Sequence, residues 1–469
     1  MTRSVRFLVV FVAGLMLVSA PLAQAARWKE PKEVYQQRRE TLRAKASAGV
    51  ILVFAAGAAE GEIGRDAFRQ DDDFYYLNGF DQPGAALLLV PKGAEKPGRP
   101  NEILFLASPN PAEERWTGPR WHASDPDIRQ KTGFDVVKDW GDFYRELAAA
   151  LGDSRYIYTV YPPPDEPNAH QRARISDLRN FGSAYAFLDI GPAVHAMRQV
   201  KSPTEMELIQ KAVDLSVDAH LEAMKAVRPG LYEYEIAALM EYVMKRGGCE
   251  RVAYAPIVGS GFDSTVLHYS ENSRRMEGGE LLVMDVGGEY GGYAADITRT
   301  IPVNSKFTPR QREIYEIVLG AQNAALAAAK PGATIGRTGE KSLYKIAYDY
   351  INTHGQDKHG NPLGRYFIHG LSHHIGLAVH DVGDVNRPLE PGMVFTIEPG
   401  IYIPEENIGV RIEDDVLVTA DGAKLLSARL PRDPGEIERI MAEARLRQAA
   451  TPACPAGASC ETQLAFPKK

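Results

Sequence analysis

The sequence Gly279-Glu-Leu-Leu-Val-Met-Asp285-Val-Gly287 has a near-copy later in the chain, Gly392-Met-Val-Phe-Thr-Ile-Glu398-Pro-Gly400. In each stretch a glycine precedes an apolar run that is typical of a buried strand. An acidic residue ends the run, and a second glycine follows two positions later. Another acid lies further along in both cases, Asp296 after the first stretch and Glu413 after the second. This repetition predicts that one structural unit occurs twice.

Helix signals precede the two acidic stretches in the same order. Ser202-Pro203-Thr204-Glu205 and Thr308-Pro309-Arg310-Gln311 are both capping boxes with proline at the first helical position. Each box predicts a helix that ends at a Pro-Gly pair and is followed by a second helix, over residues 232–246 in the first unit and 339–353 in the other. The duplicated region, residues 202–420, is therefore predicted to fold as two halves around a pseudo-two-fold axis with one shared site.

The chain before this region has the pattern of a separate domain that mixes strands and helices. Three apolar runs predict buried strands, at residues 50–54, 85–90 and 101–106. Residues 142–151 predict a helix, and the three aspartates from Asp71 to Asp73 predict a turn and a helix start rather than a metal site. We therefore expect an α/β (α+β) protein with an N-terminal domain over residues 26–200.

The C-terminal domain is predicted to cover residues 201–448 and to end in a helix over residues 436–448. Residues 449–469 are rich in small residues and proline, which predicts a flexible tail. This tail holds Cys454 and Cys460, which could pair in an oxidising compartment, and whether they do stays open.

The N-terminus has the features of a secretory signal peptide. Arg3 and Arg6 give a positive start, residues 7–19 are apolar, and Ala23-Gln-Ala25 is a small-x-small cleavage site. The apolar run is shorter than the ~20 residues of a membrane-spanning helix, although retention as an uncleaved anchor is the alternative. We expect residues 1–25 to be removed, which leaves no stable membrane anchor and an exported protein, periplasmic or secreted.

The overall charge argues against a nucleic-acid partner. The 469 residues carry a formal net charge of -7, and no dense basic run occurs. The third cysteine, Cys249, follows two glycines and is predicted to be a small buried residue.

The four acids of the repeat point to bound cations. Asp285 and Asp296 flank a glycine-rich turn, and Glu398 and Glu413 flank the corresponding turn of the second unit. If each turn closes a hairpin, its two carboxylates lie side by side, and like charges that close repel strongly unless a cation neutralises them. A single acid in a turn or on a strand is ordinarily a solvated residue, so the joint pattern carries the inference.

The ligand chemistry narrows the metal. Residues 369–381 lie between the two acidic stretches and contain four of the eleven histidines. Carboxylates with one imidazole favour harder ions such as Mn2+, and the absence of thiolates argues against a structural zinc site. Five protein ligands suit two divalent metal ions about 3.5–4 Å apart, an arrangement used for metal-assisted hydrolysis.

Six short motifs carry these residues. They are Met284-Asp285-Val-Gly, Asp296-Ile-Thr-Arg-Thr, His369-Gly-Leu-Ser-His373, Val379-His380-Asp381-Val-Gly, Thr396-Ile-Glu398-Pro-Gly and Val410-Arg411-Ile-Glu413-Asp. Together they resemble the pita-bread metallopeptidases, a family that includes aminopeptidase P, prolidase and methionine aminopeptidase. The resemblance implies a creatinase/aminopeptidase P-like N-terminal domain followed by a C-terminal pita-bread domain with an internal pseudo-two-fold repeat.

All five metal-ligand positions of that family carry the expected residue type in this chain. The resemblance implies that Asp296 and Glu413 bridge two metal ions. It assigns Asp285 to one ion, and His373 with Glu398 to the other. Glu398 is also the expected proton acceptor for the attacking water.

Further residues have implied roles around the metals. By the same resemblance, His380 would hydrogen-bond the scissile carbonyl, while His268 and His369 would line the substrate pocket. Arg411 is expected to hold Asp296 or the substrate.

The N-terminal domain sharpens the comparison within the family. The segment from Phe68 to Phe80 resembles aminopeptidase P more closely than prolidase. Trp116-Thr-Gly118-Pro-Arg120 resembles an aminopeptidase P element in which a tryptophan reaches the site of a neighbouring subunit, which implies a homo-oligomer, a dimer or a tetramer.

The implied function is removal of the N-terminal residue from peptides with proline in the second position. A prolidase that acts on Xaa-Pro dipeptides is the alternative within the same chemistry. A non-catalytic peptide-binding protein with the same fold is the alternative of another class, and the complete set of ligand positions argues against it. The native metal and the preferred first residue stay open.

Overall fold

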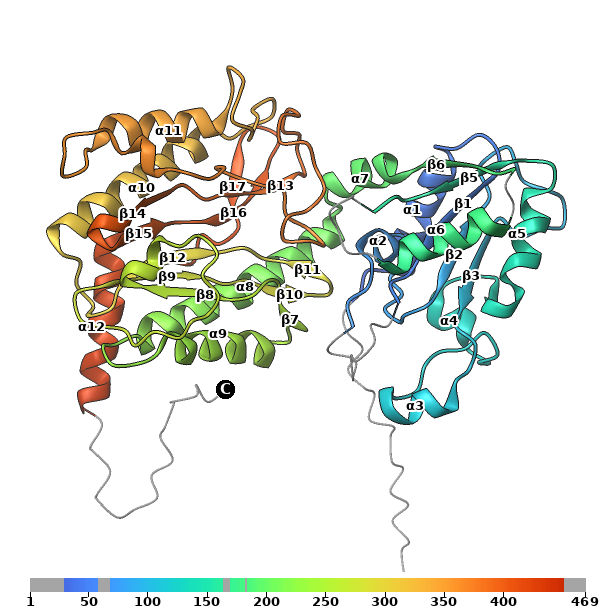
Figure 1. Cartoon of the computed structure of the whole chain (residues 1–469), viewed down its shortest axis with the longest axis horizontal. Helices are drawn as coiled ribbons and strands as arrows, with labels where there is room; N and C mark the ends of the chain where they lie inside the picture. Colours follow the sequence, from blue (N-terminus) through green and yellow to red (C-terminus); the bar gives the residue numbers. More distant parts are fainter. Residues whose placement is uncertain (1–28, 58–67, 163–168, 182–183, 451–469) are drawn as a thin grey trace, which may run out of the picture.

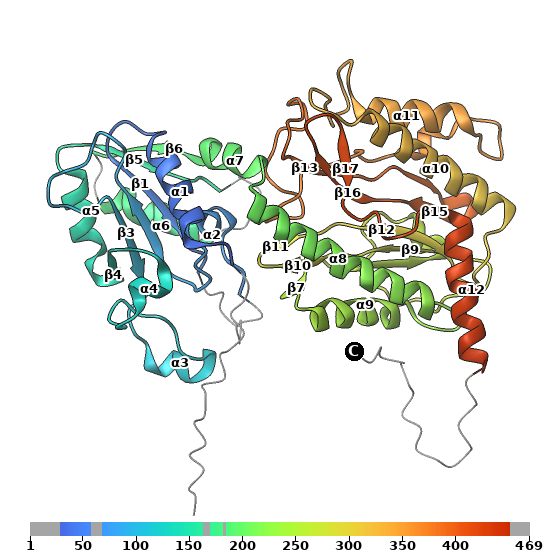
Figure 2. The ribbon, with the colours of Figure 1, turned by 180° about the vertical axis from the view of Figure 1, so that it is seen from behind.

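The computed structural model describes residues 29–57, 68–162, 169–181 and 184–450. Two lobes follow one another along the chain and are joined at α7 (Figures 1 and 2). The predicted signal peptide, the predicted tail and its two cysteines lie outside the described residues. Among the described residues, no helix combines the length and the apolar character needed to cross a membrane.

The N-terminal lobe contains a six-stranded sheet with the order β4-β3-β2-β1-β5-β6. Its helices and strands are α1 (Lys32–Arg43), β1 (Val50–Phe54), α2 (Asp72–Asn78), β2 (Ala86–Leu89), β3 (Glu102–Leu106), α3 (Pro111–Thr117), α4 (Ile128–Thr132), β4 (Val137–Asp139), η1 (Trp140–Asp142), α5 (Phe143–Leu151), β5 (Tyr156–Thr159), α6 (Ala169–Phe181), β6 (Ala186–Asp189) and α7 (Gly191–Gln199).

The three predicted strands of this lobe are confirmed as β1, β2 and β3, and the predicted helix as α5. Every residue of β1 is buried, because Ile51 and Val53 enter one apolar core and Val50, Leu52 and Phe54 enter another. A sheet covered on both faces accounts for the uninterrupted apolar runs of the sequence.

The aspartate run starts a helix, as predicted. Asp71 caps α2, because its side chain accepts a hydrogen bond from the backbone N–H of Phe74 at 2.9 Å. Its neighbour Asp73 is buried and pairs with Arg198 of α7 at 2.7 Å. The run therefore has a role in structure at the junction between the lobes.

The C-terminal lobe contains the duplicated unit. The first copy comprises α8 (Pro203–Ala226), α9 (Glu233–Gly247), β7 (Arg251–Val252), β8 (Ile257–Ser260), η2 (Gly261–Thr265), β9 (Leu281–Asp285), β10 (Gly288–Tyr290), β11 (Tyr293–Ala294) and β12 (Thr298–Pro302). The second comprises α10 (Pro309–Ala328), α11 (Leu343–His354), η3 (Leu363–Tyr366), β13 (Val394–Ile397), β14 (Gly400–Ile403), η4 (Pro404–Glu406), β15 (Ile408–Arg411), β16 (Asp414–Val418) and β17 (Ala423–Leu425), and α12 (Pro434–Ala450) follows it.

The helix predictions for this lobe are confirmed with one shift. Both capping boxes form, at Ser202 and at Thr308. The helix expected from residue 339 begins at Leu343 instead, because the Ser342 side chain caps it by accepting from the N–H of Lys345. Gly339 has a φ of 110°, which lies outside the helical region.

The paired strands are more elaborate than the simple hairpins that the turns suggest. β9 pairs directly with β12, and β13 with β16, while the chain between the members of each pair forms a smaller hairpin, β10–β11 or β14–β15. Gly287 permits this departure, because a Cβ there would lie 1.8 Å from the carbonyl oxygen of Ala295. The two halves meet where Thr298 forms an isolated bridge with Glu413.

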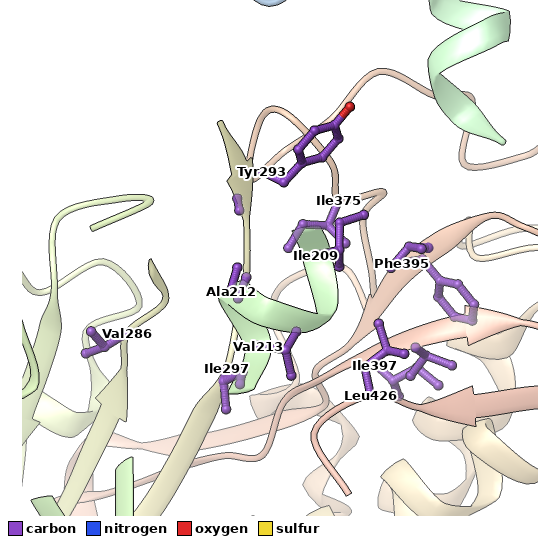
Figure 3. Packing of buried hydrophobic residues seen from close by; sticks show 14 of the residues in the cluster. Ile209, Ala212, Val213, Val286, Tyr293, Ile297, Ile375, Phe395, Ile397 and Leu426 are labelled. Atoms are coloured by element: carbon purple, nitrogen blue, oxygen red, sulfur yellow. The ribbon is translucent and has the colours of Figure 1, made fainter. Parts of the chain in front are cut away.

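The core of the C-terminal lobe is built around α8. Figure 3 shows Ile209, Ala212 and Val213 of this helix lying between Ile297 of the first copy and Ile397 of the second. α8 lies behind the strands in Figure 1 and in front of them in Figure 2, and α10 and α11 lie beside the strands of the second copy. Both sets of acidic residues are consequently held at the junction of the two half-sheets.

Candidate metal centre

The first pair of acids sits where the first copy's strands end. Asp285 is the last residue of β9, and Asp296 precedes β12, with its backbone N–H donating to Asp415 at 3.0 Å. The hydroxyl of Tyr254 lies between the two acids, 2.6 Å from Asp285 Oδ1 and 2.5 Å from Asp296 Oδ1. The expected side-by-side placement of the two carboxylates is therefore present.

Backbone hydrogen bonds to β13 place His373 and Glu398. The N–H of Thr396 donates to the carbonyl of His373, and the N–H of Glu398 donates to the carbonyl of Leu371. The imidazole Nδ1 lies 3.0 Å from the carbonyl of His374, which can only accept, so Nδ1 carries the proton. This tautomer leaves Nε2 of His373 facing Asp296 Oδ2 at 3.3 Å and Glu398 Oε1 at 3.6 Å.

Glu413 joins the two halves. Its backbone exchanges two hydrogen bonds with Thr298, and Thr298 Oγ1 donates to Glu413 Oε2 at 2.6 Å. Asp296, His373 and Glu413 each offer one ligand atom, and these atoms lie within 4.8 Å of one another. These three ligands come from both copies of the unit, and the other two predicted ligands adjoin them, Asp285 through Tyr254 and Glu398 beside His373.

The cluster holds more negative charge than the protein neutralises. Burial and the charge of Asp285 raise the pKa of Asp296, and burial with the other acids raises that of Glu413 well above its usual value. Burial raises the pKa of Glu398 to about 7, against the opposing effect of His373. Burial disfavours protonated His373, but its contacts with Asp296 and Glu398 raise its pKa to about 9. Burial is the largest cause of the three carboxylate shifts, repulsion between the acids adds to it, and the rise for His373 comes from attraction to two of those acids.

The donor set fits divalent cations. Carboxylate oxygens dominate it, and the Nδ1–H of the one imidazole is fixed by a backbone carbonyl, as is usual for a ligating histidine, which leaves Nε2 for a metal once it has lost its proton. Positive charge placed among these side chains would remove the repulsion that raises the pKa values of the acids.

The structure corrects the expectation for Arg411. Its guanidinium donates to Asp285 Oδ2 at 2.7 Å rather than to Asp296. It also donates to the hydroxyl of Tyr402 at 2.9 Å, and that hydroxyl lies 2.8 Å from His369 Nε2. His369 Nδ1 donates to the carbonyl of Gly370, so its Nε2 accepts from Tyr402.

Two predicted pocket histidines stand at the solvent side of the cluster. The ring of His380 meets that of His373 edge-on, with 4.3 Å between centroids. Partial burial and the charges of His373 and His268 lower the pKa of His380 to about 4, so the ring is neutral at pH 7. His268 and His380 both reach solvent, as residues that meet a substrate should.

Four residues of the centre were missed in the sequence. They are Tyr254, Thr298, Tyr402 and Asp415. Asp415 ends the acidic run that begins at Glu413, and Thr298 lies in the motif Asp296-Ile-Thr-Arg-Thr, but neither residue was given a role. The others are ordinary strand and loop residues whose partners lie far away along the chain.

The geometry and the fold define a metal-dependent peptidase, and comparison with known proteins gives its family. A model of metallopeptidase family M24 matches residues 207–420, and a model of the aminopeptidase P N-terminal domain matches residues 35–161. The chain belongs to metallopeptidase family M24. Both models fall on the two lobes of Figure 1, so the predicted architecture of an aminopeptidase P-like domain followed by a pita-bread domain is confirmed.

Several relatives match nearly their full length. The Xaa-Pro aminopeptidase of Escherichia coli K12 is 36% identical over an alignment of 447 residues that covers 88% of this chain and 98% of that protein. The solved structure of Escherichia coli aminopeptidase P with the inhibitor Pro-Leu has a TM-score of 0.77 at 33% identity, covering 89% of this chain and all of that one. The Xaa-Pro dipeptidase of Pyrococcus furiosus is 41% identical over 257 residues, 54% of this chain and 70% of that protein.

Proposed function

We propose that this metallo-aminopeptidase removes the first residue from peptides that carry proline in the second position. The observation that supports this most is the combination of the buried acid cluster with a match to an Xaa-Pro aminopeptidase across both lobes. The dipeptidase relative is more identical where it aligns, but it aligns with only 54% of the chain. A protein that merely binds peptides would have no need to keep four buried acids close together.

The residues of the site have separate roles in hydrolysis. Divalent cations bound there supply Lewis-acid polarisation of the scissile carbonyl and a lowered pKa for the attacking water. The carboxylate of Glu398 has contacts of 3.4 Å or more with Thr396, His369 and His373, which leaves it able to accept a proton from the attacking water and to return it. Neutral His380 keeps one ring N–H that can donate to the carbonyl oxygen as negative charge develops on it.

Proline in the second position makes the scissile bond a tertiary amide without an N–H. A site that recognises this bond must therefore act on shape and on the carbonyl oxygen, not on an amide hydrogen. The half-buried ring of His369, which lies beside Glu398 and is backed by the buried Tyr402, is the feature of this structure that suits such a substrate.

Peptide length separates this proposal from its nearest alternative. We would compare Xaa-Pro-Yaa-Yaa with Xaa-Pro, using Xaa-Ala-Yaa-Yaa and an N-acetylated Xaa-Pro-Yaa-Yaa as controls. Release of the first residue from the unblocked tetrapeptide with proline is expected. Cleavage of the dipeptide alone would favour a prolidase, and cleavage of none at saturating metal would favour a binding protein.

We propose two metal ions per chain, with Mn2+ as the native ion. Support comes from the number of donors and from their chemistry, since hard carboxylate oxygens outnumber the single imidazole nitrogen. Elemental analysis of protein purified without added metal would test both parts. About two equivalents of manganese are expected, and one equivalent or another metal would contradict the proposal.

We propose export on the basis of the N-terminal pattern Arg3, Arg6 and Ala23-Gln-Ala25. N-terminal sequencing of the protein from fractionated cells is expected to begin after Ala25 and to find the protein outside the cytoplasm. An intact N-terminus in the membrane fraction would instead support the anchor.

We propose a homo-oligomer, a dimer or a tetramer. Trp116 is 81% exposed, and α3, which carries it, buries no residue of its own. An unpartnered tryptophan on a projecting helix is a typical contact residue at an interface. Sedimentation of the wild type and of Trp116→Ala would test this, and a monomeric wild type would contradict it.

A further inference from the structure

The loop that carries His380 has no helix or strand of its own. It leads from His374 to β13, and the backbone of residues 376–384 has bends and irregular positions only. Its backbone makes few hydrogen bonds: the carbonyl of Gly376 accepts from the N–H of Ala294, the N–H of Gly376 donates to the carbonyl of Ala378, and the N–H of Asp381 donates to the carbonyl of His374. A loop with so few backbone bonds needs side-chain contacts to hold a catalytic ring in place.

Asp381, the residue after His380, supplies those contacts. Its Oδ1 accepts from Arg198 of α7 at 2.5 Å, and its Oδ2 accepts from Lys201 at 2.9 Å. The Asp381 and Lys201 side chains are each 1% exposed. Both cations lie at the junction of the lobes, so the two oxygens of one carboxylate tie the catalytic loop to this junction.

The loop is closed tightly over this ion cluster. A Cβ on Gly376 would lie 2.2 Å from Asp381 Oδ2 and 2.8 Å from Lys201 Nζ. Lys201 also donates to the carbonyl of Arg198 at 2.8 Å, so the two cations are fixed relative to each other. The cluster therefore defines where the loop backbone runs.

The N-terminal lobe completes the arrangement. Asp73 of α2 accepts from the same guanidinium of Arg198 at 2.7 Å, and His195 lies 3.1 Å from the other oxygen of Asp73. Arg69, also from this lobe, donates to the carbonyl of Leu377 within the loop at 2.6 Å. The N-terminal lobe thus contacts the His380 loop in two ways. Its Asp73 shares the Arg198 guanidinium with Asp381, and its Arg69 donates to the backbone of the loop.

We propose that Asp381 is a positioning residue for the reaction, which acts through His380, and that Arg198 and Lys201 at the lobe junction set its position. This inference rests on the function proposed above, because it assumes that His380 meets the scissile carbonyl. The N-terminal lobe then contributes to catalysis within its own chain by keeping this loop in place. The charge of Asp381 is the essential feature, since its buried carboxylate pairs with two buried cations, Arg198 and Lys201.

The test is a double-mutant cycle on the metal-loaded full-length protein with an Xaa-Pro-Yaa-Yaa substrate. Asp381→Asn keeps the size of the side chain and removes its charge. A displacement of about 1 Å in a catalytic group can lower the rate by ~100-fold, so a fall in kcat of at least 10-fold is expected, with KM within about twofold. The double variant with His380→Ala is expected to have the kcat of His380→Ala alone.

A matched control separates positioning from loss of stability. Arg38→Gln breaks another buried ion cluster between the lobes, in which Arg38 pairs with Glu30 at 2.6 Å and with Glu205 at 3.1 Å. This control is expected to lower the melting temperature without lowering kcat. Lys201→Met, which removes one of the two cations, replaces Asp381→Asn in the cycle if that variant does not fold.

Each outcome decides one point. Unchanged kcat in Asp381→Asn, or a double variant in which the two losses multiply, would overturn the positioning role while leaving the proposed function intact. A wild type that cleaves no Xaa-Pro peptide would instead refute the proposed function. Normal kcat in His380→Ala with an active wild type would refute the role of the histidine, and with it this inference.

Discussion

The two copies of the duplicated unit place an acid at the same point, and the two acids have different surroundings. Asp285 ends β9 and Glu398 follows β13, so each leaves the equivalent strand of its half. Arg411 and Tyr254 both donate to Asp285, at 2.7 and 2.6 Å. Glu398 has contacts of 3.4 Å or more with Thr396 and the neighbouring histidines. Asp285, which the Arg411 guanidinium holds, is suited to be a fixed metal ligand, whereas Glu398 is suited to exchange a proton.

The small hairpins of the two halves also differ in what they contact. β15 of the second half carries Arg411 across to Asp285 of the first, so this hairpin serves the metal centre. The corresponding hairpin β10–β11 faces the N-terminal lobe, where Glu289 pairs with Arg69 and the carbonyl of Gly291 accepts from Tyr75. The two equivalent hairpins therefore have different roles. β14–β15 supports the metal centre, and β10–β11 contacts the N-terminal lobe.

The largest effect is expected where the two halves are joined. Glu413→Gln, or Asp296→Asn, removes a carboxylate that lies among the donors of both halves. Removal of a central ligand is expected to lower kcat/KM by at least about 1,000-fold and to reduce bound metal. Steady-state kinetics with elemental analysis measure both. Near-normal turnover in either variant would contradict a shared site.

A smaller and more informative effect is expected from the two equivalent acids. Glu398→Gln is expected to lower kcat by about 100- to 10,000-fold, the usual contribution of a general base, while most of the metal stays bound. Asp285→Asn is expected to act chiefly on metal affinity, with part of the activity restored by excess metal. The measurement is kcat as a function of metal concentration for both variants. Identical titration curves would mean that the asymmetry between the halves has no consequence for function.

Removal of the contact between Arg411 and Asp285, which links the two halves, is expected to have an intermediate effect on metal binding. Arg411→Gln leaves Asp285 without its buried cation, and loss of such a supporting contact typically lowers metal affinity by about 10- to 100-fold. Competition with a chelator gives that affinity. Arg310→Gln is the control, since this arginine pairs with Glu406 at 2.8 Å in a less buried pair beside the same hairpin. Equal losses in the two variants would show that only general stability had changed.

The repeat was readable in the sequence because its signals are local. The capping boxes at Ser202 and Thr308 lie within four residues each, and the apolar strands end in their acids directly. Local patterns of this kind do not depend on contacts with distant parts of the chain. The order of elements in the two units therefore predicted the shared site, and the resemblance supplied the ligand set.

The contacts that distinguish the two halves were not readable, because they join residues far apart in the chain. Arg411 was expected to hold Asp296 or the substrate, and its guanidinium donates to Asp285, a contact that depends on how β15 lies against β9. Tyr254 follows α9 in an unremarkable segment, and only the folded chain brings its hydroxyl between two acids. The same applies to Asp381, whose partners come from the lobe junction.

The smallest effect that still tests the comparison is expected from Tyr254→Phe. The variant keeps the ring and removes one hydroxyl, which donates a single proton and so can satisfy only one of Asp285 and Asp296 at a time. Cations bound to the same two carboxylates would take over most of the neutralisation, so a loss of several-fold in kcat/KM, about 1 kcal/mol, is expected rather than inactivity. The loss should be larger in protein assayed at limiting metal than at saturating metal, because the hydroxyl and the cations act on the same charges. Kinetics at both metal concentrations, with Tyr402→Phe as a second hydroxyl deletion at the same centre, give the comparison. An effect of Tyr254→Phe that does not depend on metal would mean that the hydroxyl contacts the substrate and not the acids.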